Sequence, residues 1–151
     1  MRQDPARLTF EIDAREGDAR TGRLMTPHGP VATPAFIPLA TKGSVRGMAS
    51  REVAGMGFEM VLGNTYHLLV APGPDRIAAA GGLHGFMAWE KAIITDSGGF
   101  QVFSLAHGGV AEEIKGSGGK RDGLAAVLGI EEEGVKFRSY RDGSELKLSP
   151  E

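Results

Sequence analysis

Three short runs of consecutive apolar residues constrain the fold of this 151-residue chain more strongly than any other feature. The runs cover residues 35–39, 60–62 and 92–94, and a polar or glycine-containing segment follows each of them. Continuous rather than alternating apolar character is typical of strands that are buried on both faces of a parallel sheet. We therefore expect the three runs to be adjacent parallel strands.

Helix signals separate these runs. Ser50 is a candidate N-cap for a helix over residues 51–56, with Glu52 in its first turn. Pro74 suits the first position of a second helix, which we expect to end near Ala80. Strands that alternate with helices in this way predict an α/β fold built on a parallel sheet.

The residues before the first run show a different pattern. Apolar and polar residues alternate over residues 8–12, and residues 19–25 and 31–33 have the character of two further strands between turns. Half-buried strands of this kind predict a small antiparallel sheet, which we assign to an N-terminal region over residues 1–34. Residues 35–151 then form the second region.

The C-terminal part contains two further signals. Residues 106–126 are rich in glycine and charged residues, which predicts a flexible loop. Residues 127–148 are typical of a hairpin whose turn contains Asp142 and Gly143. The last three residues, 149–151, have the sequence Ser-Pro-Glu of a helix start with no helix behind it, so we expect that the chain is truncated at this point.

The composition excludes several classes of protein. There is no cysteine, which rules out a disulfide framework, a cysteine-based zinc site and a thiol nucleophile. No apolar run approaches the roughly 18 residues of a membrane span, so we expect a cytoplasmic protein without a membrane partner. A formal net charge of −2 disfavours a general nucleic-acid binder but is compatible with binding one RNA through a local patch. No metal-ligand spacing is present among the four histidines, which are His28, His67, His84 and His107. We therefore predict no metal site in this chain.

The segment TDSGGFQVFSL over residues 95–105 carries the strongest candidate site. Asp96 follows the third apolar run directly, and the carboxyl ends of parallel strands are where α/β sites are built. Gly98 and Gly99 let the backbone approach a flat ligand, and Phe100 offers a ring face to it. These groups suit a planar heterocycle with hydrogen-bonding edges, although Asp-Ser-Gly-Gly is also a common turn sequence.

This segment resembles the signature of the tRNA-guanine transglycosylases, also called queuine tRNA-ribosyltransferases. Three other segments are similar to that family: PAFIPLATKGSVRGM over residues 34–48, LGNTYHLLVAPG over 62–73 and GVKFRSYRDGSELKLSPE over 134–151. The resemblance implies an α/β fold that is the N-terminal portion of a (β/α)8 TIM barrel, preceded by a small antiparallel β-sheet. Residues 35–151 would then be the first part of the barrel.

The resemblance also implies an activity. Family members exchange guanine at the anticodon wobble position of tRNA for a 7-deazaguanine by double displacement, and act as homodimers. Carried over to this sequence, Asp96 matches the acid/base aspartate. The implied substrate-binding residues are Ser97, Gly98, Gly99 and Phe100, with Asn64 near the ribose and Leu39 and Leu62 as apolar walls.

Other parts of the family pattern are expected beyond residue 151. These are the nucleophilic aspartate and the zinc site, so we expect no cofactor within this chain and no activity from it alone. The implied partners are tRNA and a guanine or 7-deazaguanine base.

Two alternatives remain. The first is a non-catalytic subunit that helps a catalytic partner bind tRNA, although the retention of Asp96 favours an enzyme. Separately, the basic residues Lys42, Arg46 and Arg51 would suit RNA phosphate or simply face solvent. The second is an unrelated barrel enzyme that acts on a sugar phosphate. It is disfavoured because the best phosphate-loop candidate has Ile114 and Arg121 where glycine and a hydroxyl residue are needed.

Overall fold

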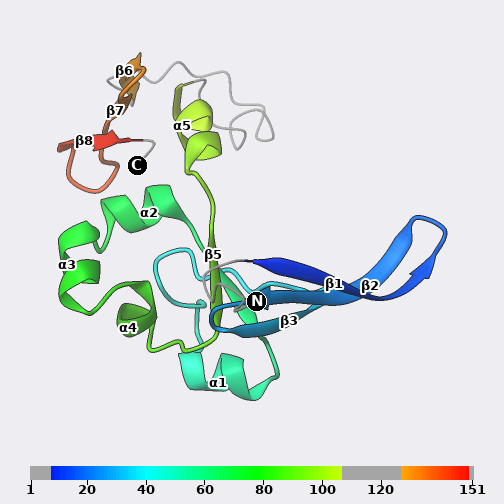
Figure 1. Ribbon diagram of the computed structural model, residues 1–151. Coiled ribbons are helices and arrows are strands. Elements are labelled where there is room, and N and C mark those ends of the chain that lie inside the picture. Colours follow the sequence, from blue (N-terminus) through cyan, green and yellow to red (C-terminus); the bar gives the residue numbers. More distant parts are fainter. Residues whose placement is uncertain (1–7, 107–126, 150–151) are drawn as a thin grey trace, which may run out of the picture. The chain divides into compact units, whose positions relative to one another are not determined.

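A computed structural model describes residues 8–106 and 127–149 (Figure 1). The chain divides into two compact units. Unit 1 contains the residues up to 63 together with residues 74–95, and unit 2 contains residues 64–73 together with the residues from 96 onward. Both units combine helices with strands, as the sequence predicts for a mixed α/β protein.

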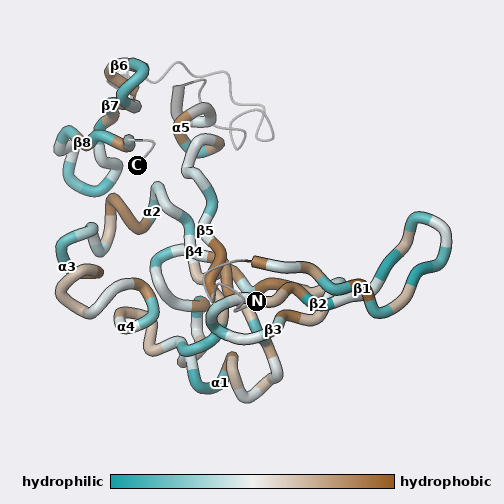
Figure 2. Tube along the Cα trace, in the orientation of Figure 1, coloured by the Kyte–Doolittle hydropathy of each residue, from teal (hydrophilic) through white to brown (hydrophobic). Residues whose placement is uncertain are grey.

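Unit 1 begins with the expected antiparallel sheet. Its strands are β1 (Thr9–Glu16), β2 (Ala19–Thr26) and β3 (Gly29–Thr33), which pair in the order β1-β2-β3. The alternation over residues 8–12 therefore correctly predicted a strand, and this strand lies in an antiparallel sheet as expected. Figure 2 shows a hydrophilic tip on the β1–β2 hairpin, where charged residues surround Gly17.

Two of the three apolar runs form a parallel pair in unit 1. Strands β4 (Met60–Gly63) and β5 (Ala92–Thr95) pair in parallel with Met60 opposite Ala92. Figure 2 shows both strands as strongly hydrophobic. Continuous apolar character predicted this pairing correctly.

The expectation of a third strand over residues 35–39 is wrong in part. This segment makes only an isolated parallel bridge between Leu39 and Leu62, with Ala40 N–H donating to the Leu62 carbonyl at 2.7 Å. The Leu62 N–H donates in turn to the Pro38 carbonyl at 3.0 Å. Pro34 and Pro38 have no backbone N–H to donate, which limits a regular hydrogen-bonded ladder over this segment. One bridge and two regular strands do not make up a barrel, so the (β/α)8 barrel stays a prediction.

Three helices complete unit 1: α1 (Ser50–Gly55), α3 (Pro74–Ala79) and α4 (Leu83–Met87). Helix α3 begins at Pro74 as predicted, whereas α4 gave no clear sequence signal. Ser50 is not the N-cap of α1, because Ala49 occupies that position and its N–H donates to the Glu52 carboxylate at 2.7 Å. The Ser50 hydroxyl donates instead to the Met87 carbonyl at 2.6 Å, which ties α1 to the end of α4.

The interior of unit 1 has two apolar clusters. The larger one is centred on Val53, Val61, Met87 and Trp89, and the smaller one joins the first sheet to β4 and β5 through Val31, Met60 and Ala92. Trp89 is buried, and its indole N–H donates to the Ala92 carbonyl at 3.0 Å, so this residue has a packing role.

Unit 2 contains two helices and a second antiparallel sheet. The helices are α2 (Thr65–Val70) and α5 (Gly99–Ala106). The sheet consists of β6 (Val127–Glu131), β7 (Gly134–Arg138) and β8 (Glu145–Leu148) in the order β6-β7-β8. The hairpin predicted over residues 127–148 thus has a third strand.

The core of unit 2 explains how its parts hold together. Tyr66 from α2, Val102 from α5 and Phe137 from β7 form a buried cluster, and further apolar residues of β7 and β8 pack against it. The flexible loop predicted over residues 106–126 lies, from residue 107 on, outside the described residues. Within the described part of the chain, no helix has the length and apolar character needed to cross a membrane.

Candidate active site

Asp96 lies at the start of the second segment of unit 2, directly after the last residue of β5. One carboxylate oxygen accepts a hydrogen bond from the Asn64 side-chain amide at 2.5 Å. The other accepts from the Thr65 backbone N–H at 2.9 Å, and the Thr65 hydroxyl donates to the Asp96 backbone carbonyl. Two adjacent residues at the start of α2 therefore hold both the side chain and the backbone of Asp96.

Asn64 has a second structural task. It is buried and is the N-cap of α2, with its side-chain oxygen accepting the His67 N–H at 3.0 Å. Rotating the amide by 180° would set donor against donor at His67 and acceptor against acceptor at Asp96, so the network assigns the oxygen and nitrogen positions. The resemblance predicted a polar role for Asn64, and the structure places it in contact with Asp96.

Thr65 is a residue that sequence reasoning missed. Its backbone N–H is the first of the helix, so it has no partner within α2, and Asp96 supplies one. A carboxylate at this position also meets the positive end of the helix dipole. A carboxylate has about four lone-pair positions, so these two donors leave room for a ligand to donate to Asp96.

The two glycines after Ser97 differ in their surroundings. Gly98 is buried with φ +73°, and a Cβ there would lie 3.1 Å from Tyr66 N and 3.2 Å from Leu148 Cδ2. Gly99 is exposed, and its N–H donates to the Ser97 hydroxyl oxygen at 3.2 Å as α5 begins. The segment is therefore a turn, as expected of the common turn sequence Asp-Ser-Gly-Gly. It also leads directly into a helix, and Gly98 within it is tightly packed.

Ser97 and Phe100 are both exposed, and Phe100 leaves 66% of its surface accessible. A large aromatic side chain gains stability from burial, so a ring left this open next to a polar turn is available to a ligand.

Leu39 and Leu62 belong to unit 1, where they form the isolated bridge. Leu39 is 62% exposed, whereas Leu62 is half-buried. The structure thus brings Asp96 together with Asn64 and the glycine turn within unit 2, and it pairs the two leucines within unit 1. The substrate-binding roles assigned to these residues remain predictions.

Other candidate groups have structural explanations. Asp142 accepts hydrogen bonds from the Ser144 N–H at 3.1 Å and hydroxyl at 2.7 Å, and these bonds lower the pKa of its carboxyl. Asp75 is an exposed residue in the first turn of α3. Among residues 8–106 and 127–149, no three His, Cys, Asp or Glu side chains lie close enough together to hold a metal ion.

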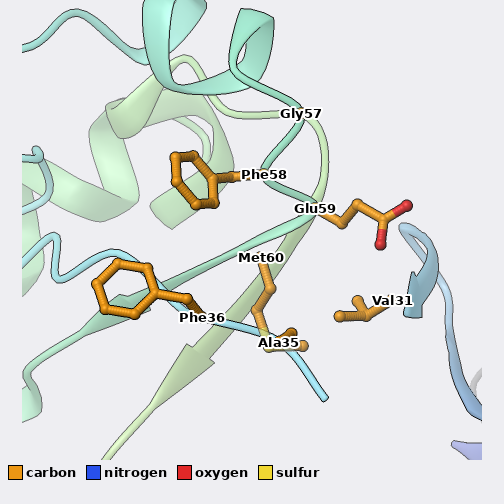
Figure 3. Close-up of a pocket in the computed structure, with 7 residues that line it drawn as sticks. All are labelled: Val31, Ala35, Phe36, Gly57, Phe58, Glu59 and Met60. Atoms are coloured by element: carbon orange, nitrogen blue, oxygen red, sulfur yellow. The ribbon is translucent and has the colours of Figure 1, made fainter. Parts of the chain in front are cut away.

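A small pocket of about 190 Å³ lies elsewhere in unit 1 (Figure 3). Its lining comes from β3, the segment after it and the residues that lead into β4, and includes Phe36 and Phe58. Figure 3 shows the Glu59 side chain turned toward β3, where it accepts the Ala32 N–H at 2.8 Å. The pocket lies at the amino end of β4 and contains none of the predicted site residues, so it is not the predicted base-binding site.

The fold and the site together define a class. Asp96 follows a parallel strand, is oriented by two donors and precedes a glycine turn with an exposed aromatic ring. This placement is typical of α/β proteins whose ligand sites lie at strand ends. A family model described as Queuine tRNA-ribosyltransferase matches residues 14–151, and the chain belongs to this family.

Curated relatives agree with this assignment. The chain is 53% identical to the queuine tRNA-ribosyltransferase of Chlamydia abortus over 146 residues, which is 95% of this chain and 38% of the relative. It is 47% identical over 148 residues to the protein of the same name from a strain of Thermus thermophilus, covering 98% of this chain and 33% of the relative. The protein from a Roseiflexus species is also 47% identical, over 95% of this chain and 36% of its own length. The chain therefore spans between a third and two fifths of the length of these relatives.

Proposed function

We propose that this chain forms the N-terminal part of a tRNA-guanine transglycosylase, which replaces guanine at the wobble position of tRNA with a 7-deazaguanine. The observation that carries the proposal is the Asp96 carboxylate, held by Asn64 and Thr65 next to the Gly98 turn. The names of the relatives support the substrate class. The tRNA partner and a homodimeric assembly are part of the same proposal.

Asp96 would transfer protons to and from the exchanged bases. As a second carboxylate, supplied outside this chain, bonds to C1′ of the ribose, the bond to guanine breaks and the departing ring nitrogen gains a proton. The incoming base loses a proton from the same ring position when its bond to C1′ forms and the carboxylate leaves. Protonated Asp96 donates in the first half and its carboxylate accepts in the second, as a general acid and then a general base.

The arrangement of hydrogen bonds suits this role. Asn64 and Thr65 fix the direction of the carboxylate, while the exposed Ser97 and Phe100 leave a surface next to it for a planar base. The zinc site implied by the family would lie outside this chain, and no step assigned to Asp96 depends on it.

The test is incorporation of labelled guanine into substrate tRNA by the product of the complete reading frame. We expect Asp96→Asn to lower the exchange rate by about 10²–10⁴, the usual contribution of a general acid/base group. The new amide can accept from only one of its two present donors, so circular dichroism and the unfolding midpoint must show that the fold is retained. Asp142→Asn, in an exposed turn, is the matched control and should exchange guanine normally.

Exchange by Asp96→Asn at nearly the wild-type rate would refute the proposal. In that case the glycine segment would be only a turn. A wild-type protein that folds but exchanges no guanine would instead favour a non-catalytic tRNA-binding subunit. Residues 1–151 alone should show no exchange, because the nucleophile is missing.

A further inference from the structure

Gly98 is enclosed by two elements of unit 2. The first turn of α2 is one of them: its Tyr66 backbone nitrogen and Cβ lie 3.1 and 3.2 Å from the position that an added Cβ would take. The Leu148 side chain of β8 is the other, with its Cδ2 3.2 Å from the same point. An added methyl group would be closer to these atoms than ordinary van der Waals contact allows, so α2 and Leu148 fill the space next to the Gly98 Cα.

The same two elements determine the position of Asp96. Gly98 is two residues after Asp96, and Tyr66 directly follows Thr65, whose N–H donates to the Asp96 carboxylate. A shift of Gly98 would therefore move Asp96 relative to the Thr65 donor. Of the three described atoms nearest to the added Cβ, the Leu148 Cδ2 is the one that does not belong to α2.

Leu148 is itself held firmly. It pairs with Val135 of β7, and a Cβ at Gly134 would lie 2.3 Å from the Leu148 carbonyl oxygen, so the two backbones are in close approach. Its side chain belongs to the cluster around the buried residues Tyr66, Val102 and Phe137. Strand pairing and core packing in the sheet β6–β8 thus fix the position of the Leu148 side chain next to Gly98.

We propose that Leu148 is a positioning residue for Asp96: by packing against Gly98 it keeps the carboxylate in register with the Asn64 and Thr65 donors. This inference rests on the proposed function, since it assigns the second antiparallel sheet a part in base exchange. Leu148 does not contact the reacting atoms, and its effect is transmitted through Gly98.

The chain contains a matched control in Leu146. Both leucines lie on β8, both are half-buried and both pack against the same cluster, but Leu146 lies opposite Phe137. Leu148→Ala and Leu146→Ala should therefore lose similar stability. In the product of the complete reading frame, we expect Leu148→Ala to lower kcat about tenfold, because small misplacements of catalytic groups have large effects. KM for tRNA should stay within about twofold of the wild-type value in both variants. The kcat of Leu146→Ala should also stay within about twofold of the wild-type value.

Two further variants define the contact. Leu148→Met keeps a side chain long enough to reach Gly98 and should restore kcat to within about twofold. If Leu148→Ala does not fold, Leu148→Val takes its place, because valine favours strands but lacks the outer carbon that meets Gly98.

Hydrogen exchange gives a readout that does not need activity. The peptide over residues 62–68 contains the Thr65 amide, and we expect it to exchange about fivefold faster in Leu148→Ala and to be unchanged in Leu146→Ala. Equal effects of the two alanine variants, or none from Leu148→Ala, would overturn the positioning role. A wild-type protein that exchanges no guanine would instead refute the proposed function, and the amide comparison would still decide the role of Leu148.

Discussion

The described residues form two three-stranded antiparallel sheets with the same strand order, β1–β3 in unit 1 and β6–β8 in unit 2, and these sheets differ in how deeply their residues are buried. Every residue of β1 is exposed, including Phe10 and Ile12, and ion pairs from Arg23 to Glu11 and Asp13 lie on its surface. In β7, by contrast, Phe137 is completely buried beneath Tyr66 and Val102.

The difference does not come from the strands themselves. Both sheets have alternating sequences, which fix two faces but do not say which face will be covered. In unit 2 the helices α2 and α5 cover one face. Helix α2 begins at Thr65 after its N-cap Asn64, which contacts Asp96, and α5 begins at Gly99, three residues after Asp96. The second sheet thus packs against the helices that begin next to the candidate site residue Asp96, whereas the first sheet packs against β4 and β5.

The largest expected difference concerns aromatic residues. We expect Phe137→Ala to lower the free energy of unfolding by about 3–5 kcal/mol, the range for truncating a buried phenylalanine. Phe10→Ala should cost at most about 1.5 kcal/mol, because Phe10 is already 43% exposed. Urea unfolding followed by circular dichroism measures both. Equal losses would mean that the two sheets are equally important to the fold.

A second comparison uses two glycines with positive φ. Gly98 has φ +73° and close neighbours, whereas Gly17 in the β1–β2 turn has φ +58° and nothing within 4 Å of an added Cβ. We expect Gly17→Ala to cost about 1 kcal/mol from backbone strain alone, and Gly98→Ala to cost about 2–3 kcal/mol because its methyl group also meets Tyr66 and Leu148. The same unfolding experiment applies. A Gly98→Ala variant as stable as Gly17→Ala would show that the space around Gly98 is not restricted.

The smallest effect is expected on the surface of the first sheet. Arg23 lies 3.2 Å from Asp13 and 3.7 Å from Glu11, and its side chain is 51% exposed. Arg23→Ala should therefore change the free energy of unfolding by less than about 1 kcal/mol, and the difference should shrink in high salt. A larger loss that persists at about 1 M NaCl, where surface charges are strongly screened, would indicate a role beyond surface electrostatics.

The sequence predicted the elements whose signals are local. Alternation identified β1, continuous apolar runs identified β4 and β5, and Pro74 marked the start of α3. It failed at residues 35–39, where apolar character suggested a strand but the prolines limit regular pairing. It also missed β6, whose alternation is interrupted by Gly129.

The sequence indicated the central residues of the candidate site but not the residues that pack around them. Asp96 and Gly98 could be identified because they follow an apolar run and resemble a family signature. Thr65 and Leu148 could not, because their contacts join residues about 30 and 50 positions apart along the chain, and only the folded backbone creates them. Helix α2 was not predicted either, although asparagine, its N-cap at Asn64, is a residue that favours this position.

The central claim is that the Asp96 carboxylate, held by Asn64 and Thr65, binds the exchanged base. The most direct measurement is a crystal structure of the product of the complete reading frame with guanine bound. We predict an Asp96 carboxylate oxygen about 2.6–3.2 Å from a guanine nitrogen, with the Thr65 N–H bond to Asp96 retained. Guanine bound away from residues 96–100, with no hydrogen bond to Asp96, would contradict the account.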